Sequence, residues 1–228
     1  MAVSPELRSS LISKLDVAGW PVVADRIIYG LCHDLNGRAN SLSNLAYLMT
    51  SEGNAWEEVS SVVEEEVTRL EEAVRLLRLL PDDAGEEGLL APREFLTLLP
   101  RLVRIQPGLE LVETVGDISV EMPAIRMDET LFTRCLLLLL SGAAEAASAD
   151  GVNIVRMQSG EDPRVVRIAP LRDSSGSVDD GAGSGRSLPP EMEALVAEVI
   201  AEIGGEAVAI GREGGTRGLE LRLPGGVS

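Results

Sequence analysis

The stretch Gly30–Met49, GLCHDLNGRANSLSNLAYLM, decides the fold prediction because its apolar residues recur at intervals of three and four. Such spacing predicts a helix with one apolar seam, in which a single step, Arg38, is polar. The seam consists of Ile28, Leu31, Leu35, Leu42, Leu45 and Met49. If these residues take the a and d positions of a heptad, His33 takes position f on the opposite side. We therefore expect the His33 imidazole to face water or a partner.

His33 is the only histidine in the chain, and Asp34 follows it directly. A solvated imidazole is largely neutral at cellular pH, so one ring nitrogen carries a lone pair that can attack phosphorus. Asp34 is the candidate hydrogen-bond acceptor or general base beside it. The alternative is that a single exposed histidine on a helix has no chemical role.

Composition restricts the class of protein. The 228 residues are 45% hydrophobic, which indicates a globular chain with a core, and the net charge of −17 disfavours binding to nucleic acid or to an anionic membrane. Cys32 and Cys135 form neither a disulfide framework nor a metal-ligand spacing. No signal peptide is recognisable, and the apolar run Cys135–Leu140 is too short to span a bilayer. We expect a cytoplasmic protein without a membrane anchor.

The first third of the chain predicts a helical hairpin. Residues 1–20 contain a short helix, Pro5–Leu15, and a break before Pro21, and are expected to be an N-terminal extension. Residues 21–82 follow as two long helices joined by a turn at 50–54. The second helix, from about Ala55 to Leu80, has its own seam of Val59, Val63, Leu70, Ala73, Leu77 and Leu80.

A single hairpin has too little inner surface to bury both seams together with Val62, Val67 and Val74. We therefore predict a homodimer whose two hairpins form a four-helix bundle. The alternative is that the seams pack only on the protein's own second domain.

Residues 89–228 predict an α/β sandwich, separated from the hairpin by a polar linker at 81–88. The fold class is therefore α+β. The expected helices are Pro92–Ile105, interrupted or ended near Pro100, then Met127–Ser148 with Asp128 as cap, and Pro189–Ile203. The expected strands are 109–115 and 118–122, paired as a hairpin through Gly116-Asp117, then 152–158, 164–169, 206–211 and 217–223.

The run His33-Asp34-Leu35 followed by a polar residue resembles the H-box of two-component signalling proteins, which lies on the first helix of a dimerising hairpin. By that resemblance His33 is the phosphorylated residue. The order of elements in 89–228 resembles the ATP-binding domain of histidine kinases, the Bergerat or GHKL fold. Together the two resemblances cover nearly the whole chain.

The nucleotide motifs of that family are degraded here. The asparagine that holds magnesium in a pattern like N-L-L-x-N-A-x-E-A is replaced by Ser141 or Gly142 within Leu136–Ala146. The D-x-G-x-G motif is reduced to Asp173 and Gly176 at the wrong spacing, and Asp180–Gly185 is better explained as a linker than as a phosphate cradle. We expect that ATP binding is lost and that the chain has no cofactor or metal of its own.

An intact histidine hairpin before a degenerate ATPase-like domain resembles the histidine phosphotransferases of bacterial phosphorelays, of the ChpT type. The resemblance implies response-regulator receiver domains as partners, Mg²⁺ supplied by the receiver, and transfer through His33 assisted by Asp34. Helical geometry places a docking surface around His33. Its expected members are Arg26, Tyr29, Gly30, Asn36, Gly37, Asn40 and Asn44.

Two alternatives stay open. One is a divergent, ATP-dependent histidine kinase that uses another residue for magnesium. The other is a non-catalytic pseudokinase scaffold that binds a receiver and transfers nothing. Gly37, four residues after His33, stands where such kinases with phosphatase activity carry Thr or Asn, so we expect weak hydrolysis of a partner's aspartyl phosphate.

Overall fold

The structure is a computed structural model of the chain. It describes residues 3–51, 56–80, 87–149, 151, 154–171, 190–211 and 217–224. Residues 52–54 of the predicted turn, 81–86 of the predicted linker and 172–187 of the predicted loop lie outside the described residues, and with them Asp173, Gly176 and Asp180–Gly185.

Two helices form the N-terminal part. Helix α1, Pro5–Val17, begins after Ser4, whose side chain accepts a hydrogen bond from the Leu7 backbone N–H at 3.2 Å. Gly19 then adopts a φ of 102°, a conformation that only glycine takes without strain, and the chain turns into α2, Trp20–Ser51. The predicted break before Pro21 is therefore a tight elbow between two helices.

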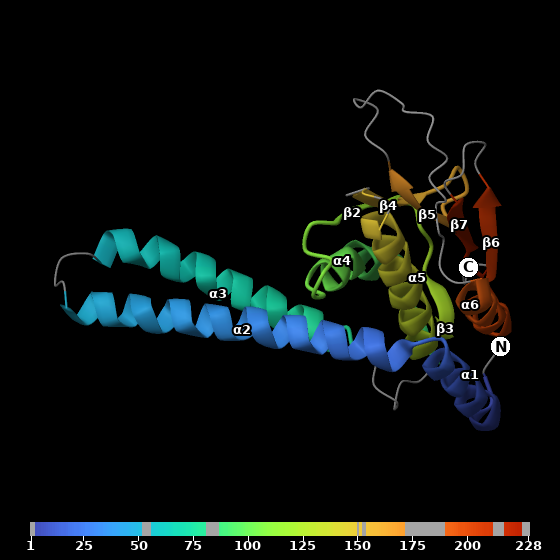
Figure 1. Cartoon of the computed structure of the whole chain (residues 1–228), viewed down its shortest axis with the longest axis horizontal. Coiled ribbons are helices and arrows are strands. Elements are labelled where there is room, and N and C mark those ends of the chain that lie inside the picture. The colour runs from blue at the N-terminus through green and yellow to red at the C-terminus, as the bar shows by residue number, and fades with distance from the viewer. Residues whose placement is uncertain are drawn as a thin grey trace.

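Helix α2 and helix α3, Trp56–Arg78, lie side by side as a long arm that projects from the rest of the molecule (Figure 1). Leu35, Leu42 and Leu45 of α2 are half-buried in the arm, as are Val63 and Leu70 of α3. The predicted hairpin is present, with a partly covered seam.

The predicted seam is wrong at two residues near the base of the arm, although its members Leu31 and Ala73 are buried there as predicted. Ile28 and Leu77 are 46% and 45% exposed, whereas their neighbours Ile27 and Leu76 are 0% and 6% exposed. In this region α2 packs against α1 and α5 as well as α3. These additional neighbours turn a different face of each helix inward from the one that a two-helix seam predicts.

The body of the molecule contains one mixed sheet. Its order is β2-β4-β5-β7-β6, with β2 and β4 parallel and the other neighbours antiparallel. These strands are β2 Glu113–Asp117, β4 Ile154–Ser159, β5 Val165–Leu171, β6 Glu206–Gly211 and β7 Arg217–Arg222. A separate antiparallel ribbon pairs β1, Glu87–Leu90, with β3, Ile125–Asp128.

Helices cover one face of the sheet. Helix α4, Pro92–Arg104, packs on β2, α5, Glu129–Ala149, on β4 and β5, and α6, Pro190–Glu202, on β6. On this face Val155, Met157, Val166 and Ile168 are buried, whereas Arg156, Arg167 and Arg222 on the opposite face are exposed. The predicted α+β class, a helical hairpin followed by an α/β sandwich, is confirmed.

Three local predictions in this part are wrong. Residues 109–115 and 118–122 do not form a hairpin, because β2 contains Gly116-Asp117 and pairs in parallel with β4. Glu87 and Gly88, predicted as linker, belong to β1. Pro100 lies inside a continuous α4, whose buried residues Leu96 and Leu99 hold it against the core.

Helix α5 is the centre of the core. The predicted cap is confirmed, since Asp128 accepts a hydrogen bond from the Leu131 N–H at 3.0 Å. Among the described residues α5 is the one helix whose length and composition could cross a membrane, and 78% of its most apolar window is buried in the fold. The same core extends through Leu11, Ile27, Leu31 and Leu76, so the base of the arm and the body share one hydrophobic interior.

Candidate functional site

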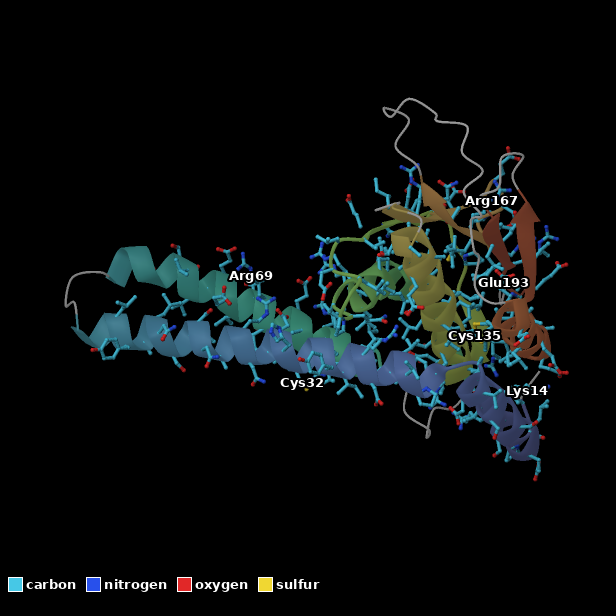
Figure 2. The ribbon with its side chains drawn as sticks, in the orientation of Figure 1. Lys14, Cys32, Arg69, Cys135, Arg167 and Glu193 are labelled. Atoms are coloured by element: carbon cyan, nitrogen blue, oxygen red, sulfur yellow. The ribbon has the colours of Figure 1, made fainter. Side chains whose placement is uncertain are left out.

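His33 stands on the outer surface of α2, near the middle of the arm. Its side chain is exposed, whereas Leu31 is 1% exposed and Leu35 is half-buried. No described residue makes a hydrogen bond or an ion pair with the imidazole. Figure 2 shows the adjacent Cys32, which is also exposed, on the side of α2 that faces away from α3. The ring is therefore accessible to a reactant from solvent.

Asp34 is engaged within the arm. Both of its carboxylate oxygens accept hydrogen bonds from Arg38, from Nε at 2.9 Å and from Nη2 at 2.8 Å. Arg38 also lies 3.7 Å from Glu66 of α3, and Glu66 in turn pairs with Arg69 at 3.0 Å. This chain of charges joins α2 to α3 one turn beyond His33.

The ion pair explains the polar step in the apolar seam. Arg38 and Glu66 are 20% and 13% exposed, and such charges are tolerated at an interface only when they are paired. The sequence carried a signal for them, since Arg38 interrupts the seam of α2 and Glu66 falls between Val63 and Leu70 of α3. Both carboxylate oxygens of Asp34 accept hydrogen bonds from Arg38, and Asp34 makes no hydrogen bond to the His33 imidazole.

Most of the predicted docking residues lie on the open face. Tyr29 is 64% exposed, and Asn36, Gly37, Asn40 and Asn44 are exposed as well. A Cβ placed on Gly37 would meet no atom within 4 Å. There is open space one turn from the imidazole.

Two predicted docking residues have other contacts. Gly30 is buried, and a Cβ placed on it would lie 1.9 Å from the carbonyl oxygen of Ile105, so it is required for the close approach of α2 to the end of α4. Arg26 makes an ion pair with Glu145 of α5. The sequence pattern missed both roles because each depends on a residue far away along the chain.

The base of the arm is joined to the body at several points. Besides the Gly30 contact and the Arg26 pair, Glu72 of α3 makes an ion pair with Arg101 of α4. Ala73 is 2% exposed and Leu76 is 6% exposed at the same junction. Backbone contact, ion pairs and shared apolar burial together fix the arm on the body.

The position at which the family resemblance places a magnesium-binding asparagine lies in the core. Ser141 is 1% exposed, and its hydroxyl accepts a hydrogen bond from Gln106 Nε2 at 2.7 Å. Gly142 offers no side-chain oxygen. Among the described residues no group of three or more His, Cys, Asp or Glu is arranged to hold a metal ion. The residues in this part of α5 therefore do not fit a magnesium nucleotide.

Known proteins resemble this chain only in structure. No sequence profile of a known protein family matches it, and no curated protein matches it either. A bacterial phosphotransferase is similar at 13% identity over 88% of this chain and 95% of that one, with a TM-score of 0.43. The cytoplasmic segment of histidine kinase QseC is similar at 11% identity over 70% of this chain and 93% of that one, with a TM-score of 0.45.

A third similar structure is histidine kinase ThkA in complex with response regulator protein TrrA. It shares 14% identity over 97% of this chain and 67% of that one, with a TM-score of 0.41. At these identities and TM-scores the similarities assign no function to this chain.

Proposed function

We propose that this protein is a histidine phosphotransferase of two-component signalling, which relays a phosphoryl group between response-regulator receiver domains through His33. The observation that carries the proposal is the exposed and unengaged imidazole on a fixed helical arm. A lone pair on one ring nitrogen forms the N–P bond while the P–O bond to the receiver's aspartate breaks, and that carboxylate leaves with the electron pair. The proton stays on the other ring nitrogen.

The geometry supports a positioning role for Asp34. Its carboxylate is held by Arg38, so we assign it to fixing the helix beside His33 rather than to accepting the imidazole proton. The receiver supplies Mg²⁺ in this proposal.

The junction between arm and body favours transfer over an ATP-dependent kinase reaction. A kinase domain must carry its nucleotide to the histidine, but the base of the arm shares the core of this body through Ile27, Leu31 and Leu76, and Gly30 packs closely against Ile105. Ser141 and Gly142 do not provide the metal ligand that such a domain needs. These two observations favour the transfer reaction over the divergent kinase.

The arm also supports the proposed homodimer. On α3, apolar residues recur at alternating intervals of four and three, yet Val67, Val74 and Leu77 remain 41%, 38% and 45% exposed. The same spacing on α2 joins Ile28, Cys32, Leu35, Ala39, Leu42 and Ala46. Two such stripes left partly uncovered by one hairpin fit a second copy of the hairpin, which would complete a four-helix bundle.

A charge introduced on the apolar stripe of α3 tests the proposed homodimer. Val74→Asp is expected to shift the chain from dimer to monomer in sedimentation, because a carboxylate would be buried at the interface. Thr68→Asp is the matched control, since Thr68 is exposed beside the stripe, on the polar face of α3. An unchanged mass for Val74→Asp, or a monomer already in the parent protein, would contradict the homodimer.

The proposed docking face consists of Tyr29, Asn36, Gly37, Asn40 and Asn44 around His33, with Arg26 at its border. Gly30 is left out because it is buried. Tyr29 is the residue expected to contribute most, since exposed aromatic side chains often dominate binding energy at interfaces. Tyr29→Ala should slow transfer from a receiver while the far-ultraviolet circular dichroism spectrum stays unchanged.

The decisive experiment is incubation of the full chain with receiver domains phosphorylated on aspartate. We expect label on the chain that is labile in acid and stable in base, and complete loss of that label in His33→Ala. Arg75→Gln, an exposed change on the far helix of the arm, is the control and should be labelled normally.

The other outcomes identify the alternatives. Labelling from ATP alone would favour the kinase. No label from any receiver, with a regulatory effect that survives His33→Ala, would favour the scaffold and overturn the proposed transfer.

A further inference from the structure

His33 has few side chains beside it on its own face of α2. Residues three and four positions apart on a helix are neighbours, whereas adjacent residues point in different directions, so Asp34 does not face the ring. The residues at these spacings are Tyr29, Gly30, Asn36 and Gly37. The two glycines carry no side chain. Tyr29 and Asn36, both exposed, are therefore the side chains that border the imidazole.

The direction of helical side chains separates these two neighbours. Side chains on a helix lean toward its N-terminus. The imidazole therefore leans over the turn that holds Tyr29, and Tyr29 itself leans away from the ring, toward the base of the arm. Asn36, one turn after His33, leans back toward it. This direction brings the Asn36 carboxamide toward Nδ1, the ring nitrogen closer to the backbone, whereas Nε2 lies at the outer end of the ring.

The carboxamide of Asn36 is uncommitted. Asn36 makes no hydrogen bond with another described residue, and neither does the imidazole. Asp34 differs in this respect, because both of its oxygens accept hydrogen bonds from Arg38. Exposed side chains change rotamer within picoseconds to nanoseconds, so rotation of Asn36 and His33 can bring the carboxamide oxygen to Nδ1 without a change in the helix.

We propose that Asn36 is a positioning residue for His33, whose carboxamide oxygen accepts a hydrogen bond from Nδ1–H. A neutral imidazole carries its proton on one nitrogen, and the hydrogen bond at that nitrogen decides which tautomer prevails. Without such a bond the Nε2–H tautomer prevails in water, which places the proton on the outer, more accessible nitrogen. With the bond, Nε2 keeps the lone pair that forms the N–P bond, and the proton stays on Nδ1. The role in transfer rests on the proposed function, whereas the tautomer does not.

Nitrogen-15 NMR of the full chain tests the tautomer, because His33 is the only histidine and its ring signals are unambiguous. At a pH where the ring is neutral, we expect Nδ1–H as the major tautomer in the parent protein and Nε2–H in Asn36→Ala. Asn36→Asp keeps an acceptor oxygen at this position and should retain Nδ1–H. Asn40→Ala is the matched control, since Asn40 is exposed two turns from His33 and should leave the tautomer unchanged.

A transfer assay measures the consequence for the proposed reaction. With a phosphorylated receiver in excess, Asn36→Ala should lower the maximal rate of labelling of His33 about three- to tenfold, the loss expected for one hydrogen bond. If Asn36 contributed only to docking, the receiver concentration at half-maximal rate would rise while the maximal rate stayed unchanged. That result would contradict the positioning role.

The two experiments separate this role from the proposed function. If Nε2–H is the major tautomer in the parent protein, or if Asn36→Ala leaves the tautomer ratio unchanged, the role of Asn36 is refuted even when a receiver transfers its label to His33. The expected tautomers without label from any receiver would support the hydrogen bond from Nδ1–H to Asn36 and refute the proposed phosphotransfer.

Discussion

The two ends of α2 differ in what covers them. At the base, Val23, Ile27 and Leu31 are 7%, 0% and 1% exposed and belong to the core of the body. Beyond Asn36 no described side chain of α2 is buried, and Tyr47 is 72% exposed. The base of α2 is therefore part of the core, whereas its outer half is open to solvent. His33, the proposed site of phosphorylation, lies where the two meet.

The largest expected effect is a difference in stability between alanine substitutions at two neighbouring isoleucines, Ile27 and Ile28, at the base of the arm. Ile27→Ala should lower the free energy of unfolding by about 2–5 kcal/mol, because it leaves a cavity in the core, whereas Ile28→Ala should lower it by less than about 1 kcal/mol. Urea unfolding at concentrations where the chain is monomeric measures both. Equal losses would mean that the base is not embedded as described.

A second test makes the same substitution at two positions of α2. Gly30→Ala should destabilise the fold by about 1–3 kcal/mol, because the new Cβ would overlap the Ile105 carbonyl oxygen. Gly37→Ala should stabilise it by about 0.5–1 kcal/mol, because the site is open and alanine is the better helix former. Urea unfolding provides the measurement. If both substitutions changed the free energy of unfolding in the same direction, the two ends of α2 would not differ in packing as described.

A smaller effect is expected at the ion pair between α2 and α3. Arg38→Gln should lower the free energy of unfolding by about 1 kcal/mol, since it leaves Asp34 and Glu66 without one partner. Arg75→Gln, at an exposed residue outside this ion pair, should change the free energy of unfolding by less than about 0.5 kcal/mol. A double-mutant cycle with Asp34→Asn measures the coupling directly. A coupling energy of zero would show that the pair does not hold the arm.

The sequence predicted the helical arm better than it predicted how the base of the arm packs on the body. Spacing within one helix is local information, so the two helices of the hairpin could be predicted from residues 28–80, and the exposed position of His33 from the first of them. The sequence did not show which of Ile27 and Ile28 is buried, because their burial depends on packing against α5, about 115 residues away along the chain. The parallel pairing of β2 with β4 is also long-range, and the local turn signal at Gly116-Asp117 therefore gave the wrong hairpin.

The candidate site shows the same division. The open residues around His33 follow from helical geometry, but the burial of Gly30 depends on Ile105, and the Arg26 pair depends on Glu145. The junction between the arm and the body combines α2, α3 and α4, whose residues Arg38, Glu72 and Arg101 are some thirty residues apart along the chain. Only Arg38, as a charge inside an apolar seam, gave a local signal of that junction.

The last prediction compares the two cysteines, one on each part of the molecule, and involves no change in stability. Cys32 is exposed on the arm, whereas Cys135 lies in the core of α5, where burial raises the pKa of its thiol well above the ordinary value. Because the thiolate is the reactive form, one thiol per chain should react rapidly with a thiol reagent, and the second only when the fold opens. Cys32→Ser should abolish the rapid phase.

The rate of that phase also bears on the dimer. Cys32 lies on the apolar stripe of α2, so pairing of two hairpins should cover it and slow the reaction as the protein concentration rises. A rapid phase of the same rate at all concentrations would place Cys32 outside the interface. Rapid reaction of both thiols in the native chain would contradict the packing of α5 itself.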